Sequence, residues 1–323
     1  MTAEIKSVAY ALPDSILDNQ ALEALFPEWP AASIEQKIGI VKRHVVGAGQ
    51  CASDLAVAAA RKLFDSSGLK PEAVDYILLC TQSPDYLLPT TACLIQQRLC
   101  VPVSCGALDI NLGCSGYIYG LGLAKGLIET GQARNVLLLM AETYSRYLEA
   151  GDKNVRTVFG DGAAATWVAG AEADQPRIGP FVYGTDGTGA RHLMIEAGGA
   201  RTPGGQGDAF LRMNGPAIFS FTLRAVPDAV NRLLQTAGLD AGQIDLFVFH
   251  QANQFMLETL REKLRIPRGK FLYAISETGN TVSASIPIAL AEGQARGQLK
   301  PGMRAMLVGF GVGLSWGACL VRW

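Results

Sequence analysis

The sequence predicts an α/β protein in which helices cover the sheets and the second half of the chain repeats the first. Short apolar runs typical of strands alternate with segments of helical length, an order that favours covered sheets. Of the 323 residues, 49% are hydrophobic and only 18% are charged. This composition indicates a large buried interior, a large subunit interface, or both.

In the first part of the chain, apolar runs predict strands and longer periodic segments predict helices. The expected strands are residues 5–10, 76–81, 107–111, 136–141 and 163–168, and the expected helices are residues 52–66, 90–100 and 115–130. The second part alternates in the same way. Its expected strands are residues 178–183, 246–250, 271–275, 305–309 and 317–322, and its expected helices are residues 215–237, 253–265 and 283–296.

The internal repeat is clearest around Cys114 and Asn280. In each case a strand leads through a polar turn into a helix, and a glycine-containing turn then leads into an apolar strand. We therefore expect two duplicated halves, residues 1–172 with Cys114 and residues 173–323 with His250 and Asn280.

Cys114 stands in a glycine-flanked turn between an expected strand and a helix. A thiol at a helix N-terminus faces unpaired backbone N–H groups and the positive end of the helix dipole, which favour the thiolate. Cys114 is therefore the candidate nucleophile, whereas the other six cysteines are interpreted as small, reduced core residues. The glycines at 116, 120, 122 and 126 predict close backbone packing of the following helix.

Two further polar residues, His250 and Asn280, follow expected strands in the second half. Each has an ordinary structural explanation, because a lone histidine is commonly a hydrogen-bonded core residue and an asparagine beside a glycine is commonly a turn residue. Considered together with Cys114, however, they indicate covalent acyl chemistry.

Two glycine-containing motifs are interpreted as structural. The tail of residues 309–314 resembles a dinucleotide-binding fingerprint, but a strand rather than a helix follows, so nucleotide binding is excluded. Backbone N–H groups of such a turn can instead be directed at an oxyanion. Asp161, between two glycines, fits a structural turn better than a catalytic acid.

Charge and residue types exclude several other functions. A net charge of −1 gives no reason to expect binding to nucleic acid or to an anionic membrane. No stretch approaches the roughly 18 apolar residues that span a bilayer, and no signal-peptide core is seen, so we expect a cytoplasmic protein. The only histidines are 44, 192 and 250, and no His/Cys cluster has metal-binding spacing, so no metal site is expected.

Five short motifs, in this order, resemble the thiolase-superfamily condensing enzymes, and specifically β-ketoacyl-acyl-carrier-protein synthase III. They are residues 111–116 (NLGCSG), 159–164 (FGDGAA), 250–253 (HQAN), 277–281 (ETGNT) and 311–317 (GVGLSWG). The resemblance extends almost from end to end. It implies a thiolase-like, five-layered α-β-α-β-α fold and a homodimer, and the duplicated pattern agrees with that fold.

The resemblance also implies a role for each candidate residue. Cys114 attacks an acyl thioester of coenzyme A or phosphopantetheine, and the N–H groups of Cys114 and Gly313 bind the oxyanion, each such donor being worth about 3–4 kcal/mol. The acyl-Cys114 intermediate condenses with a malonyl thioester on an acyl carrier protein as CO2 leaves. His250 and Asn280 then donate hydrogen bonds to the enolate, because the lost CO2 already supplies the electron pair. No permanently bound cofactor is implied.

The chain departs from the family pattern where the carrier arm enters. Ser33 and Lys37 replace a tryptophan and an arginine, Lys153 replaces an arginine, Ser220 a lysine, and Phe255 an arginine. Lysine keeps the charge but loses the planar guanidinium that stacks. The loss of two docking cations weakens the case for the usual carrier protein.

Leu88 replaces a phenylalanine that, in the family, crosses the dimer interface to close the primer pocket. A roomier pocket is one consequence of this change, although one residue cannot set chain length. The substrate-binding residues implied by the resemblance are Lys37, Leu88, Lys153, Phe219, Ala252, Asn253 and Phe310.

The sequence thus predicts an acyltransferase that carries out a decarboxylative Claisen condensation. One alternative is a non-condensing acyl transferase of the same fold in a specialised pathway. Another is a catalytically silent subunit of a heteromeric synthase, against which the intact Cys114, His250 and Asn280 argue. A Cys-His-Asn hydrolase of the papain type would hydrolyse thioesters without forming a carbon–carbon bond.

Overall fold

The computed structural model describes residues 1–203 and 205–323 and contains two main sheets. The first sheet has the order β1 (Thr2–Ala11), β7 (Gly162–Ala171), β6 (Asn135–Glu142), β4 (Tyr76–Cys80) and β5 (Gly106–Ile110). The second has the order β11 (Leu246–Phe249), β12 (Arg304–Gly311), β13 (Ser315–Arg322) and β8 (Ile178–Thr185). In each sheet the strand that precedes a predicted catalytic residue, β5 or β11, is an edge strand paired in parallel with its neighbour.

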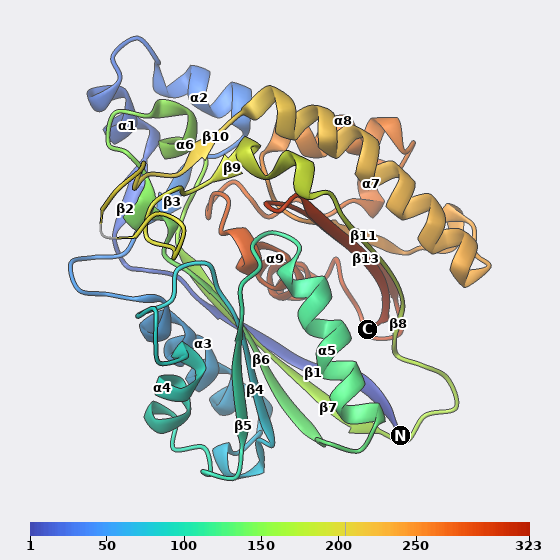
Figure 1. Ribbon diagram of the computed structural model, residues 1–323. Coiled ribbons are helices and arrows are strands. Elements are labelled where there is room, and N and C mark those ends of the chain that lie inside the picture. Colours follow the sequence, from blue (N-terminus) through green and yellow to red (C-terminus); the bar gives the residue numbers. More distant parts are fainter. Residues whose placement is uncertain (204) are drawn as a thin grey trace.

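Helices form three layers around these sheets, as Figure 1 shows. On the outer face of the first sheet lie α3 (Ala52–Ser67) and α4 (Thr91–Arg98), and α7 (Gly215–Ala237) lies on the outer face of the second, beside α8 (Gln254–Lys263). Between the sheets, α5 (Gly116–Glu129) and α9 (Ser285–Ala295) contact both. The predicted five-layered α-β-α-β-α architecture is therefore confirmed.

The central helices are apolar on most of their surface because sheets cover them on both sides. The α5 glycines allow the close approach that the sequence predicted. A Cβ atom at Gly116 would lie 2.2 Å from the Cys80 sulfur, and one at Gly120 would lie 2.7 Å from Leu138. Gly126 is the exception, because no atom lies within 4 Å of its Cβ position.

Shorter elements, which the sequence did not predict, join these layers. They are β2 (Ile16–Asp18), α1 (Asn19–Leu25), α2 (Ala31–Ile38), β3 (Lys42–His44), α6 (Lys153–Arg156), β9 (Leu193–Met194) and β10 (Arg212–Met213). Single 3₁₀ turns are η1 (Pro71–Ala73), η2 (Tyr144–Tyr147), η3 (Gly187–His192), η4 (Ala241–Gln243), η5 (Arg268–Lys270) and η6 (Val282–Ala284).

The expected strand at residues 271–275 is wrong. This segment forms a single bridge, between Phe271 and Phe247. The neighbouring strand β11 ends at Phe249, and beyond it the Gln251 side chain takes the hydrogen-bonding positions of a strand. Its amide nitrogen donates to the Leu272 carbonyl (3.3 Å) and its amide oxygen accepts from the Ala274 N–H (2.8 Å).

Strands of the first sheet all come from residues 2–171 and those of the second from residues 178–322. The division into duplicated halves at residue 172 stays a prediction. Within the described residues, no helix combines the length and the apolar character needed to cross a membrane.

Candidate active site

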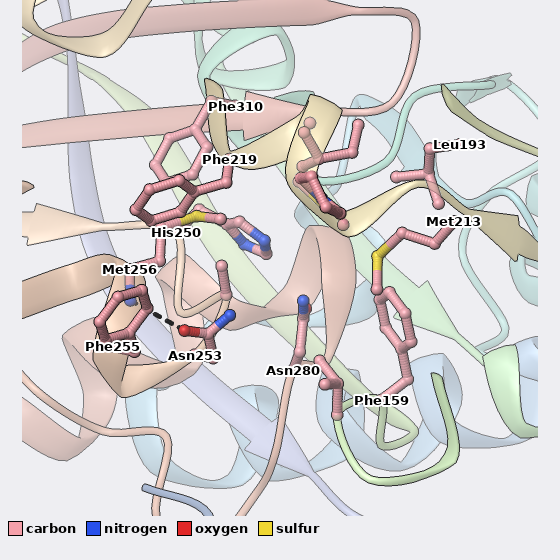
Figure 2. A pocket seen from close by; sticks show the side chains of 17 residues that line it. Phe159, Leu193, Met213, Phe219, His250, Asn253, Phe255, Met256, Asn280 and Phe310 are labelled. Carbon is pink, nitrogen blue, oxygen red and sulfur yellow. Dashed lines mark hydrogen bonds between the residues drawn. The ribbon is translucent and has the colours of Figure 1, made fainter. Parts of the chain in front are cut away.

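Cys114, His250 and Asn280 line one cavity of about 470 Å³. Cys114 lies just before α5, His250 follows β11, and Asn280 lies just before η6. The three residues are 5%, 2% and 4% exposed. Figure 2 shows the side chains of His250 and Asn280 directed into the same space. The fold therefore brings together three residues that are far apart in the sequence.

The position of Cys114 depends on close contact with the end of β12. A Cβ atom on Gly311 would lie 2.8 Å from Cys114 Cβ and 2.9 Å from its sulfur, so only glycine fits there. The N–H groups of Cys114 itself and of Val312 are hydrogen-bonded to this sulfur. The Ser115 and Ser315 hydroxyls, 2.6 Å apart, join the start of α5 to β13. The sulfur thus faces two backbone donors from different halves of the chain.

Burial raises the pKa of the Cys114 thiol to about 12, and the nearby Glu142 carboxyl raises it further, while the two N–H groups lower it. The sequence predicted that the helix N-terminus favours the thiolate. In the folded cavity the loss of hydration outweighs that effect. Cys114 at rest is therefore the protonated thiol.

His250 is fixed at the end of β11 by backbone and side-chain hydrogen bonds. Its N–H donates to the Val308 carbonyl (2.8 Å), and its Nδ1 lies 2.7 Å from Ser285 Oγ. The ring meets Phe310 edge to face at 5.4 Å. Burial lowers the pKa of His250 to about 3, so the ring is neutral. Because Ser285 can donate to Nδ1, the Nε2–H tautomer is available as a donor.

Asn280 is held by its own backbone and by the turn that follows. Its N–H donates to the Val158 carbonyl (2.9 Å), and its carbonyl accepts from the Gly160 N–H (3.0 Å). The side-chain Oδ1 accepts from the Val282 N–H (2.9 Å). With the oxygen occupied in this way, the amide N–H₂ faces the cavity, as Figure 2 shows.

Four of the predicted substrate-binding residues line the same cavity: Phe219, Ala252, Asn253 and Phe310. Asn253 is also the N-cap of α8, where its Oδ1 accepts from the Met256 N–H (2.8 Å).

Most of the remaining lining is apolar, and two patches of it face each other across the cavity. Figure 2 shows Phe159, Leu193 and Met213 opposite Phe219 and Phe310. Phe219 stacks on Phe255, with ring centroids 5.5 Å apart.

Lys37, Leu88 and Lys153 are not among the residues that line this cavity. The two lysines instead reach over the Trp29 ring, with their Nζ atoms 5.3 and 5.5 Å from its centroid. Leu88 is 83% exposed in the single chain. The sequence analysis did not single out Trp29, because it precedes the position where the family has its tryptophan.

Sequence reasoning also missed Glu142, which is fully buried behind the cavity. Its carboxyl accepts hydrogen bonds from Ser283 Oγ (2.7 Å), Ser83 Oγ (3.1 Å) and the Gln82 N–H (3.1 Å). Burial raises its pKa to about 8, and these hydrogen bonds offset part of the effect. Ser283 belongs to the turn after Asn280, so Glu142 anchors that turn to the first sheet. Its position at the end of an apolar run was the only signal in the sequence.

Asp161 is confirmed as a structural turn residue. Its carboxylate accepts from the Val46 N–H (2.8 Å), the Ser145 N–H (2.9 Å) and the Ser145 hydroxyl. These bonds tie β7 to two loops, and Asp161 does not line the cavity.

The layered fold and this cavity define the class of the protein, a thiolase-superfamily condensing enzyme. Two family models match the chain. One is described as 3-oxoacyl-[acyl-carrier-protein (ACP)] synthase III and covers residues 108–187; the other is its C-terminal part and covers residues 234–323.

Named relatives agree with these models over the full length. A β-ketoacyl-[acyl-carrier-protein] synthase III of Caldanaerobacter subterraneus is 36% identical, over 100% of this chain and 98% of that protein. A crystal structure of a 3-oxoacyl-(acyl-carrier-protein) synthase III superposes with a TM-score of 0.99 at 50% identity, with both chains fully covered. The enzyme from Pseudomonas aeruginosa PAO1 gives 0.92 at 34% identity, over 100% of this chain and 98% of that one. The chain belongs to the β-ketoacyl-acyl-carrier-protein synthase III family.

Proposed function

We propose that this protein transfers an acyl group from a thioester to Cys114 and condenses it with a malonyl thioester, releasing CO2. The observation that carries this function is the meeting of a thiol, a neutral imidazole and a primary amide in one largely apolar cavity. An apolar site strengthens hydrogen bonds to an oxyanion or an enolate. The relatives are named β-ketoacyl synthases, which describes the product of such a condensation.

In the first step the Cys114 sulfur attacks the acyl carbonyl carbon. The tetrahedral oxyanion accepts hydrogen bonds from the N–H groups of Cys114 and Val312, because both already face the sulfur. Val312 therefore takes the role that the sequence assigned to Gly313. The carbon–sulfur bond of the carrier then breaks, and the thiol proton of Cys114 ends on the departing carrier thiol.

In the second step the malonyl carboxylate leaves as CO2, and its bonding electrons form an enolate. The enolate oxygen accepts from His250 Nε2–H and Asn280 Nδ2–H, two neutral donors in a cavity that stabilises no positive charge. The enolate carbon attacks the acyl-Cys114 carbonyl, and the Cys114 thiolate leaves and regains a proton. Neither step needs a bound metal or cofactor.

We propose that the carrier arm reaches the cavity past α6. A hollow of about 440 Å³, lined in part by Asn154 and Asn214, shares Met213, Gly215 and Pro216 with the main cavity. Lys153 precedes Asn154 and lies over Trp29 together with Lys37. Two lysines beside an aromatic ring suit the phosphates and the adenine of coenzyme A, so a CoA thioester is the proposed acyl donor. An acyl carrier protein is the proposed source of the malonyl group.

A homodimer is also part of the proposal. Tyr86, Leu87 and Leu88 are consecutive and are 62%, 87% and 83% exposed in the single chain. Such a run of exposed apolar residues is typical of a subunit interface. All seven cysteines are unpaired, which suits the reducing cytoplasm as the location.

Intact-mass spectrometry tests the function directly. Incubation with a panel of acyl-CoAs is expected to add one acyl group to the protein and none to Cys114→Ala. Adding a malonyl thioester with an isotopic label on its free carboxyl is then expected to release labelled CO2 and a β-keto product. An adduct on Cys114→Ala would disprove the nucleophile. Acylation without CO2 release would favour a non-condensing acyl transferase.

A further inference from the structure

A second, smaller cavity of about 170 Å³ lies behind Cys114. Its lining residues are Gln82, Asn111, Tyr144, Met194, Ile195, Leu211 and Val312. Val312 links it to the nucleophile, because its N–H is hydrogen-bonded to the Cys114 sulfur. A Cβ atom on Gly113 would lie 2.5 Å from Gln82 Oε1 and 2.7 Å from Val312 Cγ1. Both side chains therefore press against the backbone next to Cys114.

One thin wall separates this cavity from the main one. Leu193 and Met213 pair across the β9–β10 ribbon and line the main cavity. Their chain neighbours on the same ribbon, Met194 and Leu211, line the smaller one. Tyr144 completes the wall, because its ring packs on Phe159 with centroids 5.4 Å apart.

The smaller cavity differs from the main one in its polar groups. Tyr144, only 4% exposed, donates a hydrogen bond from its hydroxyl to Gln82 Oε1 (2.6 Å). That bond fixes the amide and leaves its N–H₂ group to bind something else. A plain alkyl chain placed here would cover the amide nitrogen without giving it a partner, which is unfavourable.

We propose that the smaller cavity holds the acyl group carried by Cys114, and that Gln82, held by Tyr144, selects a short acyl chain bearing a hydroxyl or keto oxygen. This selectivity rests on the proposed function. The volume suits a short chain, since a water-sized group takes about 30 Å³ and the cavity has room for roughly five or six. The oxygen accepts from the Gln82 N–H₂ group, while the apolar walls contact the carbon chain.

Competition between matched thioesters tests the selectivity. Butyryl-CoA and 3-hydroxybutyryl-CoA have the same chain length and differ by one hydroxyl, and acylation of Cys114 from an equal mixture is followed by intact-mass spectrometry. The wild type is expected to favour the hydroxyacyl group about tenfold or more, the usual cost of an unpaired buried polar group. Gln82→Met, of similar length but without the amide, is expected to lose or reverse the preference. Tyr144→Phe is expected to reduce it.

Gln235→Met, the same change at an exposed position on α7, is the control and should keep the wild-type preference. Acetyl-CoA, too short to reach Gln82, reports on acylation itself. Acetylation of Cys114 together with equal use of the two four-carbon thioesters would overturn the selectivity alone. A preference that persists in both Gln82→Met and Tyr144→Phe would overturn it as well. No acylation from any of the three thioesters would instead overturn the proposed function.

Discussion

The floor of the main cavity and its entrance differ in how their residues are held. The three proposed catalytic residues at the floor are at most 5% exposed and lie at strand ends or helix starts. At the entrance, Phe255 is 61% exposed, and the Lys153 side chain is 38% exposed and also pairs with Glu28 at 3.1 Å. Chemistry needs geometry fixed to a fraction of an ångström, whereas a long carrier arm can be bound by adaptable side chains. Changes at the floor should therefore alter rates far more than changes at the entrance.

The largest effect is expected from the two enolate donors. Asn280→Ala and His250→Ala should lower decarboxylation of a malonyl thioester about 10²–10³-fold, because each removes one hydrogen bond to developing charge. Acylation of Cys114 should largely remain, since its oxyanion is bound by backbone N–H groups. Stopped-flow acylation and release of labelled CO2 measure the two steps separately. Equal loss of both steps would contradict this division of roles.

Gly311→Ala breaks the floor without removing any catalytic group. The new Cβ would lie 2.8 Å from Cys114 Cβ, so the sulfur must move. Misplacement of this size is expected to slow acylation by about 10²-fold and to lower the free energy of unfolding by about 1–3 kcal/mol.

Gly126→Ala is the matched control on α5, because nothing lies within 4 Å of its Cβ position. It should raise the free energy of unfolding by about 0.5–1 kcal/mol and leave acylation unchanged. Urea unfolding and the acylation assay measure both effects. A Gly311→Ala enzyme as fast as the wild type would show that the close contact at β12 is unimportant.

Glu142 makes stability of the floor depend on pH. Its pKa is raised from 4.5 to about 8 in the folded protein. Between these values the folded state keeps a proton that the unfolded state has released, so stability falls as pH rises, by up to roughly 4–5 kcal/mol. Glu142→Gln carries no such proton and should lose less stability between about pH 5 and about pH 9.

Urea unfolding of wild type and Glu142→Gln at both pH values measures the difference, with the exposed Glu72→Gln as control. Parallel pH dependence in the wild type and Glu142→Gln would mean that Glu142 is already ionised at neutral pH.

The smallest effect is expected at the entrance. Lys153→Ala should raise KM for acyl-CoA roughly threefold to tenfold and change kcat little, because an exposed charge contributes at most about 1 kcal/mol. The effect should shrink at high salt. Lys62→Ala, on the exposed side of α3, is the control. A fall in kcat of the size seen for Asn280→Ala would remove the distinction between floor and entrance.

Most of the layered architecture could be predicted because apolar periodicity reports burial directly, as the strands and the glycine-rich α5 show. The strand at residues 271–275 failed because its apolar pattern is real, but Gln251 rather than a neighbouring strand meets its backbone. Short elements such as α2 and α6 carry few residues and little periodicity. Trp29 lay outside the motif positions, so only the structure places it beside the two lysines.

The sequence alone determined the order of strands and helices, the family, and which cysteine, histidine and asparagine deserve testing, because short motifs and local periodicity are properties of neighbouring residues. The tertiary structure decided which backbone N–H, that of Val312, faces the sulfur. It also decided that burial keeps Cys114 protonated, and that Gln82 and Tyr144 form a polar cavity behind it. Contacts and pKa values of this kind depend on groups that are distant in the chain and on the exclusion of water, neither of which is written in any local stretch of sequence.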